Sequence, residues 1–246
     1  MLIRFVVDNV LSFGKQREFN MIPMSSLEKL NEHKYRISNF DVLKMSSVYG
    51  ANGSGKSNLI KSLRLLQEIV KLGITNLSHS KHEFKFNEVM GEKPITLVVE
   101  YFQDGASYLY GIQILNGIIT TEELYKTGLG VKDDELLFER TTDANTKQIK
   151  IESPLFNQSE KSKIVKEMLE NTFSKVDQIT FRVLANMKDD YLEEVRKAIA
   201  WFDNTLLVVA PHSKPTGLTH QISSNDDFKK YTESTMKSFR TCLVKV

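Results

Sequence analysis

The sequence predicts an α/β fold in which a strand–loop–helix unit is followed by an antiparallel β-meander and then by a helical section. A glycine-rich loop at 50–57 stands between a short apolar run and a stretch with helical spacing. Asp-Gly and Asn-Gly pairs then separate strand-like runs of period two, which is the strongest short hairpin signal. After Pro154 the apolar spacing becomes helical.

The glycine-rich loop reads Gly50-Ala51-Asn52-Gly53-Ser54-Gly55-Lys56-Ser57 and fits the phosphate-binding pattern G-x-x-x-x-G-K-[ST] at every fixed position. The approach, 42–49, is partly apolar and β-branched, which predicts a strand. The exit, 56–72, has the apolar spacing of a helix, and Gly73 follows where a C-terminal cap belongs. The unit therefore predicts a P-loop NTPase fold.

The residue types in this loop suit a nucleoside triphosphate. Glycines let backbone N–H groups approach the phosphates closely, and the N-terminus of the following helix favours an anion. Lys56 would reach the β- and γ-phosphates, and Ser57 would offer its hydroxyl to Mg²⁺. The predicted nucleotide-binding residues are Gly50, Ala51, Asn52, Gly53, Ser54, Gly55, Lys56, Ser57 and Asn58, with Ser57 as the magnesium ligand.

The alternative interpretation of the loop is a glycine turn before an ordinary helix. The chain has no Asn-Lys-x-Asp element for reading guanine, so we expect ATP.

The chain divides into three predicted sections. Residues 1–82 hold two N-terminal strands, at 2–7 and 18–22, and the P-loop unit. Residues 83–152 hold the hairpins. The predicted strands of the hairpin section are 95–102, 107–114, 118–125, 135–140 and 147–151.

The third section, 153–246, is predicted to be mainly helical. Ser159 is expected to cap a helix with Ile164, Val165, Met168, Leu169 and Phe173 on its apolar face. Asp189 or Asp190 is expected to cap a second helix, with Tyr191, Leu192, Val195, Ile199 and Phe202 pointing inward. A buried strand is expected at 205–210, and a last helix at 226–239.

The composition is that of an ordinary globular protein. The 246 residues are 41% hydrophobic and 26% charged, and the formal net charge is +2. The near balance of basic and acidic residues does not indicate nucleic-acid binding. The basic residues at 81–85 and 161–166 are most simply interpreted as solvated surface. The single Cys242 excludes an intramolecular disulfide framework and favours a cytoplasmic location. No apolar run approaches the length of a membrane span, so we expect no membrane association.

Hydrolysis also needs an acidic residue for Mg²⁺, usually at the end of an apolar strand. The nearest match is 97–100, with Glu100 as its only acid, and an outward-facing strand position is the simpler interpretation. Asp189 and Asp190 are paired acids, but they stand at a predicted helix start. A Leu-Ser-Gly-Gly-like loop was not found in the chain.

The extended motif from Val48 to Leu59 resembles the ABC-type ATPases of the SMC/RecF/OLD group, which carry Gly-x-Asn-Gly-Ser-Gly-Lys-Ser-Asn. The stretches 3–5 and 9–13 are similar to that group's opening strand and Asn-Phe-x-Ser-Phe turn. The stretches 108–112, 122–125, 137–140 and 201–204 resemble a bacterial AAA/ATP-GTP phosphatase-like subfamily. The resemblance covers nearly the whole chain and implies an ABC-ATPase-like lobe.

The resemblance also implies a function. It implies ATP binding with Mg²⁺, ATP hydrolysis, and a homodimer or larger oligomer formed through the ATP site. Members of the subfamily often serve in antiphage defence or abortive infection, beside or fused to a Toprim-like nuclease, so a nuclease partner and nucleic acid are implied. Asn52 would lie near the γ-phosphate. Gln178 is the candidate for the glutamine with which such proteins sense Mg²⁺, and an ordinary polar helix or loop residue is the alternative.

The family pattern continues into a second half with the signature loop and the acidic strand end, neither of which was found here. The chain is therefore expected to be an N-terminal fragment, the product of an interrupted gene, or a subunit completed by a partner. The leading hypothesis is an ATP-binding lobe of a defence ATPase. The alternative is a truncated, non-hydrolysing regulatory subunit. The third hypothesis is a P-loop kinase, and the large hairpin section argues against it.

Overall fold

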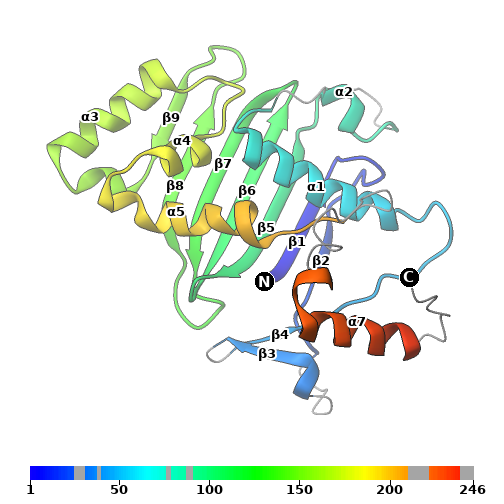
Figure 1. The fold of residues 1–246 in the computed structure, drawn as a ribbon. Helices are drawn as coiled ribbons and strands as arrows, with labels where there is room; N and C mark the ends of the chain where they lie inside the picture. Colours follow the sequence, from blue (N-terminus) through cyan, green and yellow to red (C-terminus); the bar gives the residue numbers. More distant parts are fainter. Residues whose placement is uncertain (25–30, 38–39, 76–78, 87–90, 210–221, 239–246) are drawn as a thin grey trace. The chain divides into compact units, whose positions relative to one another are not determined.

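A seven-stranded antiparallel sheet organises the first part of the chain (Figure 1). The structure, a computed structural model, describes residues 1–24, 31–37, 40–75, 79–86, 91–209 and 222–238. The strand order is β2-β1-β5-β6-β7-β8-β9. The bounds are β1 Leu2–Asp8, β2 Arg17–Asn20, β5 Ile95–Gln103, β6 Ala106–Leu115, β7 Ile118–Thr127, β8 Glu135–Thr142 and β9 Ile149–Glu152. The mixed α/β class with an antiparallel sheet is thus confirmed.

The predicted meander is present, with each strand from β5 to β9 paired to the next. The turn before β6 has Asp104 and Gly105 at φ 47° and 84°, and the turn before β7 has Asn116 and Gly117 at φ 51° and 83°. Two consecutive residues with positive φ define the type I′ turn, which suits the twist of a hairpin. The two turn signals in the sequence therefore correspond to real hairpins.

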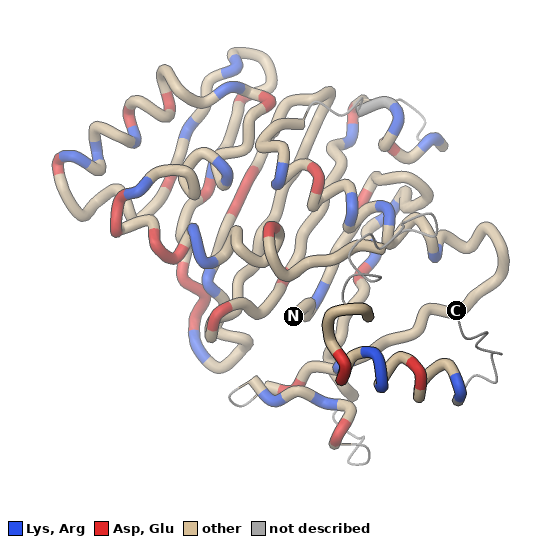
Figure 2. Tube along the Cα trace, in the orientation of Figure 1, with Lys and Arg blue, Asp and Glu red and all other residues tan. Residues whose placement is uncertain are grey.

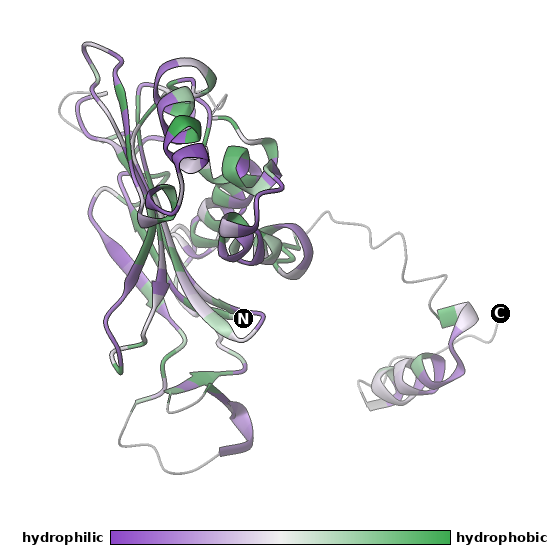
Figure 3. Cartoon of the chain, turned by 90° about the vertical axis from the view of Figure 1, so that its left-hand side faces the viewer, coloured by the Kyte–Doolittle hydropathy of each residue, from purple (hydrophilic) through white to green (hydrophobic). Residues whose placement is uncertain are grey.

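The helices of this part lie on one face of the sheet, as the side view shows (Figure 3). Alternate strand residues, such as Val99, Tyr101 and Tyr110, face these helices and are fully buried. The core therefore forms between the sheet and a single layer of helices.

Helix α1, Lys56–Leu72, follows the glycine-rich loop as predicted. Its buried side chains include Leu65, Leu66, Ile69 and Val70, which match the helical spacing of the sequence. Gly73 ends the helix with φ 75°, and its N–H donates to the carbonyl of Ile69. The predicted glycine cap is confirmed.

The helical section consists of short elements, including two π-helical turns. The bounds are Pro154–Asn157 (3-10), α3 Glu160–Met168, Leu169–Phe173 (π), α4 Thr180–Asn186, Asp190–Leu192 (3-10), α5 Glu193–Ala200 and Trp201–Thr205 (π). Ser159 caps α3 in a capping box with Ser162, as its position predicts. Leu192, Val195, Ile199 and Phe202 are buried as expected, and Tyr191 is half-buried.

Three predictions for this section are wrong. Of the expected apolar face of α3, Ile164, Met168 and Phe173 are exposed, because the helix packs mainly through Leu169 and Val165. The expected strand is absent from the described residues 205–209, since Thr205 ends a π turn and the chain leaves the sheet there. Asp189 precedes a 3-10 turn without a side-chain cap and instead pairs with Lys161. Helix α4 was not predicted.

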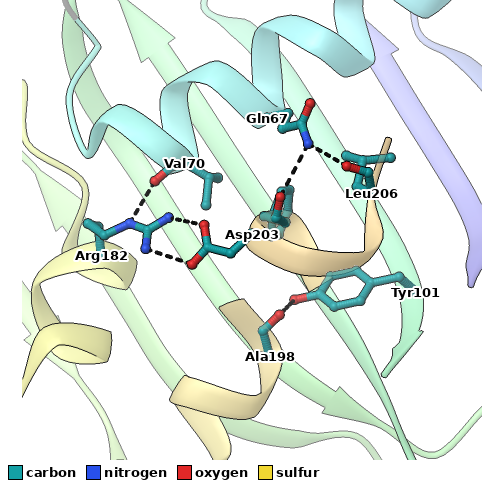
Figure 4. Close-up of polar contacts among 8 residues, drawn as sticks. Gln67, Val70, Tyr101, Arg182, Ala198, Asp203 and Leu206 are labelled. Carbon is teal, nitrogen blue, oxygen red and sulfur yellow. Dashed lines mark hydrogen bonds and ion pairs between the residues drawn. The ribbon is translucent and has the colours of Figure 1, made fainter. Parts of the chain in front are cut away.

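Helix α1 is joined to the helical section by side-chain contacts (Figure 4). The amide of Gln67 donates to the carbonyls of Phe202 (3.2 Å) and Leu206 (2.7 Å). The ring of Trp201 stacks on Tyr101 at 4.4 Å between centroids, and the Tyr101 hydroxyl donates to the Ala198 carbonyl at 2.9 Å. The Gln67 contacts tie α1 to the π turn and the chain after it, and the Tyr101 contacts tie the same region to β5.

The segment before the glycine-rich loop differs from its prediction. Strands β3, Lys34–Ile37, and β4, Phe40–Leu43, form a separate hairpin, of which β3 was unexpected. Residues 44–50 belong to no strand, although the sequence predicts one over 42–49. Met45, Val48 and Tyr49 are exposed by 72%, 46% and 89%. The apolar pattern is there, but no neighbouring strand in the described structure pairs with it.

The remaining elements are short. A 3-10 turn spans Asn31–His33 and helix α2 spans His79–His82. The chain divides into two units, Met1–Val208 and Val209–Val246, and the second contains helix α7, Asp226–Ser238, close to the predicted last helix. No helix in the described ranges has the length and apolar character needed to cross a membrane.

Candidate functional site

The glycine-rich loop wraps around the start of α1. Gly53 and Gly55 adopt φ 82° and 93°, the left-handed region that suits glycine. The Gly55 carbonyl accepts from the N–H groups of Asn58 (2.9 Å) and Leu59 (3.0 Å) and so begins the helix. The loop therefore ends in a helix N-terminus, which attracts anions through its free N–H groups and its dipole.

The Lys56 side chain folds back over the loop. Its ammonium donates to the carbonyls of Gly50 (2.6 Å) and Ala51 (2.7 Å), with the Ser54 hydroxyl at 3.4 Å. These contacts hold the charge at the centre of the loop. A phosphate entering the loop would meet this ammonium directly.

Gly50 and Gly55 leave little room for a side chain, whereas Gly53 faces open space. A Cβ on Gly50 would lie 2.8 Å from the Ser54 hydroxyl. Ser57 is exposed in the first turn of α1, Asn52 is exposed in the loop, and Asn58 is half-buried behind it. The exposed hydroxyl of Ser57 and the helix N-terminus thus lie on the open side of the loop. The nine residues 50–58 remain a prediction for nucleotide binding, and they form the loop and the first turn of α1.

The N-terminal turn, 9–14, forms a wall of the loop that sequence reasoning did not include in the site. A Cβ on Gly55 would lie 3.0 Å from the Ser12 hydroxyl and 3.5 Å from the Phe13 ring. The turn connects β1 to β2, which both precede the glycine-rich loop in the chain. The similarity of this turn to a family motif was the available signal for its role.

Gln178 lies elsewhere. It forms a β-bridge with Ile74, just after the C-terminal end of α1. Because α1 has 17 residues, its two ends are about 25 Å apart. The structure therefore does not bring Gln178 together with the P-loop of the same chain.

A buried polar cluster explains the position of Gln178. Arg140 donates to the carbonyls of Gln178 and Lys175, the latter at 2.9 Å. Glu122 accepts from the backbone N–H groups of Thr180 (2.7 Å) and Phe181 (2.9 Å) and from the Tyr110 hydroxyl (3.1 Å). The cluster pins the start of α4 to the sheet, which is a structural role.

The electrostatics of this cluster follow from its burial. Burial raises the pKa of Glu122, and the Arg140 charge and the three hydrogen bonds act in the opposite direction. Burial also raises the pKa of Tyr110 and lowers that of Arg140.

Glu100 is a structural residue in this fold. Its carboxylate pairs with Arg4 at 3.0 Å across β5 and β1, and its strand neighbours Val99 and Tyr101 face the helices. It therefore lies on the sheet face away from α1. Within the described residues, no group of three or more His, Cys, Asp or Glu side chains could hold a metal ion.

Basic and acidic residues are interspersed along α3 (Figure 2), and three lysines of this helix form ion pairs. Lys163 pairs with Glu160 at 2.7 Å, Lys166 lies 3.7 Å from Glu170, and Lys161 pairs with Asp189. A face with interspersed signs favours the interpretation as a solvated surface over that as a nucleic-acid patch.

The P-loop, its helix and the sheet with one helical layer define a nucleotide-binding domain of the P-loop class. By comparison with protein families, the chain belongs to the family described as "AAA domain, putative AbiEii toxin, Type IV TA system", which matches residues 45–227. The match supports a P-loop ATPase domain of the AAA/ABC-like kind and does not favour the regulatory alternative. Comparison with curated proteins gives no match.

Proposed function

We propose that this chain is the ATP-binding lobe of an ABC-type ATPase of the SMC/RecF/OLD-like group. The observation that carries the proposal is the Lys56 ammonium, held over a glycine loop at the N-terminus of a 17-residue helix. Lys56 and the backbone N–H groups bind the phosphates, and Ser57 holds Mg²⁺. The extended Gly-x-Asn-Gly-Ser-Gly-Lys-Ser-Asn motif supports the subgroup.

The lobe works in a bacterial antiphage or abortive-infection system, as a cytoplasmic homodimer or larger oligomer with a nuclease partner. The wording of the matched family, a toxin of a type IV toxin–antitoxin system, supports such a role. The exposure of Val48 and Tyr49 beside the loop supports a further protein surface there. ATP would join two lobes, and hydrolysis would release them.

The first test is calorimetric titration of the protein with Mg-ATP. Lys56→Ala should weaken binding at least tenfold, because it removes a charge-assisted contact to the phosphates. Lys61→Ala is the matched control, since Lys61 is exposed on the same helix. Equal affinities for the two variants would contradict the proposal.

The second test concerns the magnesium ligand and the oligomer. Ser57→Ala should weaken ATP binding in Mg²⁺ but have little effect in EDTA. Light scattering should show a larger species with Mg-ATP than with Mg-ADP, and Lys56→Ala should abolish the difference. An unchanged mass in all conditions would contradict the ATP-linked oligomer.

A further inference from the structure

The side chain of Lys93 contacts both ends of the N-terminal turn, 9–14. Its ammonium donates to the Asp8 carboxylate at 2.7 Å and to the Gly14 carbonyl at 3.3 Å. Asp8 is the last residue of β1, and Gly14 ends the turn. Lys93 lies 85 residues after Asp8 in the sequence, just before β5. A single side chain from a distant part of the sequence therefore spans the turn.

The backbone of Lys93 holds the same turn. The side-chain amide of Asn9 donates to the Lys93 carbonyl at 2.6 Å. Asn9 is fully buried and has φ 52°, a left-handed conformation that asparagine adopts more readily than most residues. The first residue of the turn is therefore fixed by the same lysine that contacts its two ends.

A second segment, 82–84, also holds the turn. The Leu11 N–H donates to the His82 carbonyl at 2.6 Å. Glu83, which is 1% exposed, accepts from the Gly91 N–H at 3.0 Å with one carboxylate oxygen and at 3.1 Å with the other. Because Gly91 and Lys93 belong to one short loop, this loop anchors the turn both directly and through residues 82–84.

The middle of the turn borders the glycine-rich loop. A Cβ on Gly55 would lie 3.0 Å from the Ser12 hydroxyl and 3.5 Å from the Phe13 ring. The Gly55 carbonyl accepts from the N–H groups of Asn58 and Leu59 and so begins α1. Backbone N–H groups bind a phosphate well when they converge on it. A displacement of the turn would therefore remove the support of Gly55 and loosen this geometry.

We infer that Lys93 is a positioning residue for phosphate binding at the P-loop and that it acts through the N-terminal turn. The inference rests on the proposed nucleotide binding. Asp8 and Gly14 use two of the three N–H donors of the Lys93 ammonium, so its charge is directed at the turn. A turn that is held in place before ATP arrives lowers the ordering cost of binding. Lys93 thereby raises the affinity of the loop for ATP without contacting the nucleotide.

Calorimetric titration with Mg-ATP tests the inference. Lys93→Met should weaken binding about fivefold, because it removes a partly exposed ion pair and the contact with Gly14. Lys93→Arg should retain near wild-type affinity, since a guanidinium can donate to both partners. Lys15→Met is the matched control, because Lys15 is exposed and adjacent to Gly14, and its loss should change the affinity by less than about twofold. Equal effects of Lys93→Met and Lys15→Met would overturn the inference.

Asp8→Asn separates positioning from a simple attraction between charges. This variant removes the negative partner of Lys93 and makes the region more positive. If Lys93 acted only by attracting the nucleotide, Asp8→Asn would strengthen ATP binding. If Lys93 acts through the turn, Asp8→Asn should weaken ATP binding, as Lys93→Met does. Stronger or unchanged binding by Asp8→Asn would overturn the inference.

Hydrogen exchange of the ATP-free protein tests the route through the turn. Lys93→Met should speed exchange of the N–H groups of Asn58 and Leu59, which bond to the Gly55 carbonyl. The Gly73 N–H, at the other end of α1, is the internal control and should exchange at the wild-type rate. Unchanged exchange at Asn58 and Leu59 would overturn this route. Faster exchange at both ends of α1 would indicate general destabilisation and would also overturn it.

Lys56→Ala keeps the two proposals apart. It should weaken Mg-ATP binding whatever the role of Lys93, and a failure to do so would overturn the phosphate site itself. If Lys56→Ala weakens binding but Lys93→Met leaves the affinity within about twofold of wild type, only the positioning role of Lys93 is overturned.

Discussion

The Arg182 guanidinium and the Asp203 carboxylate form a bidentate ion pair, with hydrogen bonds of 2.9 and 2.7 Å (Figure 4). The third donor of Arg182, Nε, reaches the Val70 carbonyl in the last turn of α1 at 2.9 Å. One side chain thus joins α4, the π turn after α5 and the C-terminal end of the P-loop helix. The contact satisfies a helix-end carbonyl that has no partner within the helix.

Arg182→Met should lower the free energy of unfolding by about 2 kcal/mol, because it removes charge-assisted hydrogen bonds at a partly buried site. Urea denaturation measures the change. Arg64→Met is the control, since the pair of Arg64 with Glu68 on the same helix is exposed and is worth at most about 0.5 kcal/mol. If both variants lost the same unfolding free energy, the bidentate geometry of the Arg182–Asp203 pair would contribute nothing to stability.

Gly55→Ala should weaken Mg-ATP binding more than Gly53→Ala. Both glycines have left-handed φ, which costs alanine about 1 kcal/mol, but only Gly55 faces a neighbour, the Ser12 hydroxyl. Calorimetry on the two variants separates the contact from the backbone strain. Adding Ser12→Ala should restore part of the loss in Gly55→Ala and none in Gly53→Ala.

Glu122→Gln should destabilise the protein by about 3 kcal/mol, because an amide cannot accept from all three donors around the carboxyl group and leaves a buried donor without a partner. Urea denaturation measures this change. Glu123→Gln is the matched control on the opposite face of β7. It should be neutral or slightly stabilising, because Glu123 stands across from Glu139.

The effect of Glu122→Gln should also depend on pH. Burial raises the pKa of Glu122 in the folded protein, so the folded state binds this proton more tightly than the unfolded state. The contribution of Glu122 to the free energy of unfolding is then complete below its pKa in the unfolded state. It falls as the pH rises through its pKa in the folded state. Urea curves from about pH 4 to about pH 8 should show the advantage of wild type over Glu122→Gln shrinking with pH. A growing advantage would contradict the raised pKa.

Ser159→Ala should cost about 1 kcal/mol, since the Ser159 hydroxyl accepts from the Ser162 N–H at 3.1 Å and caps α3. Ser159→Asp should retain most of the stability, because aspartate is an equally good cap. Thermal melts of the three proteins test this pair of expectations, and equal melting temperatures for the alanine and wild-type proteins would contradict it.

The parts of the fold that were predictable depend on local signals. Asp104-Gly105 and Asn116-Gly117 place the hairpins, and the spacing after Lys56 places α1 with its cap at Gly73. Such signals act within one turn or one helix, so they do not depend on contacts with the rest of the chain.

The parts that were not predictable depend on tertiary contacts. Glu122 and Arg140 are charged residues on the buried side of strands, and only their mutual neighbourhood makes that position acceptable. The run at Val48 and Tyr49 has a strand pattern, but a strand also needs a neighbour to pair with. Phe86 and the turn at residues 12–14 line the same cleft, although more than sixty residues separate them in the chain. No local pattern in the sequence reveals that they are neighbours.

The contacts of Lys56 with the carbonyls of Gly50 and Ala51 orient its ammonium before any ligand is present. They use two of its three N–H donors, and the third has only the Ser54 hydroxyl near it, at 3.4 Å. An anion that enters the loop can therefore take this third donor without displacing either carbonyl. Part of the conformational entropy of the long lysine side chain is thus lost on folding and not on ligand binding.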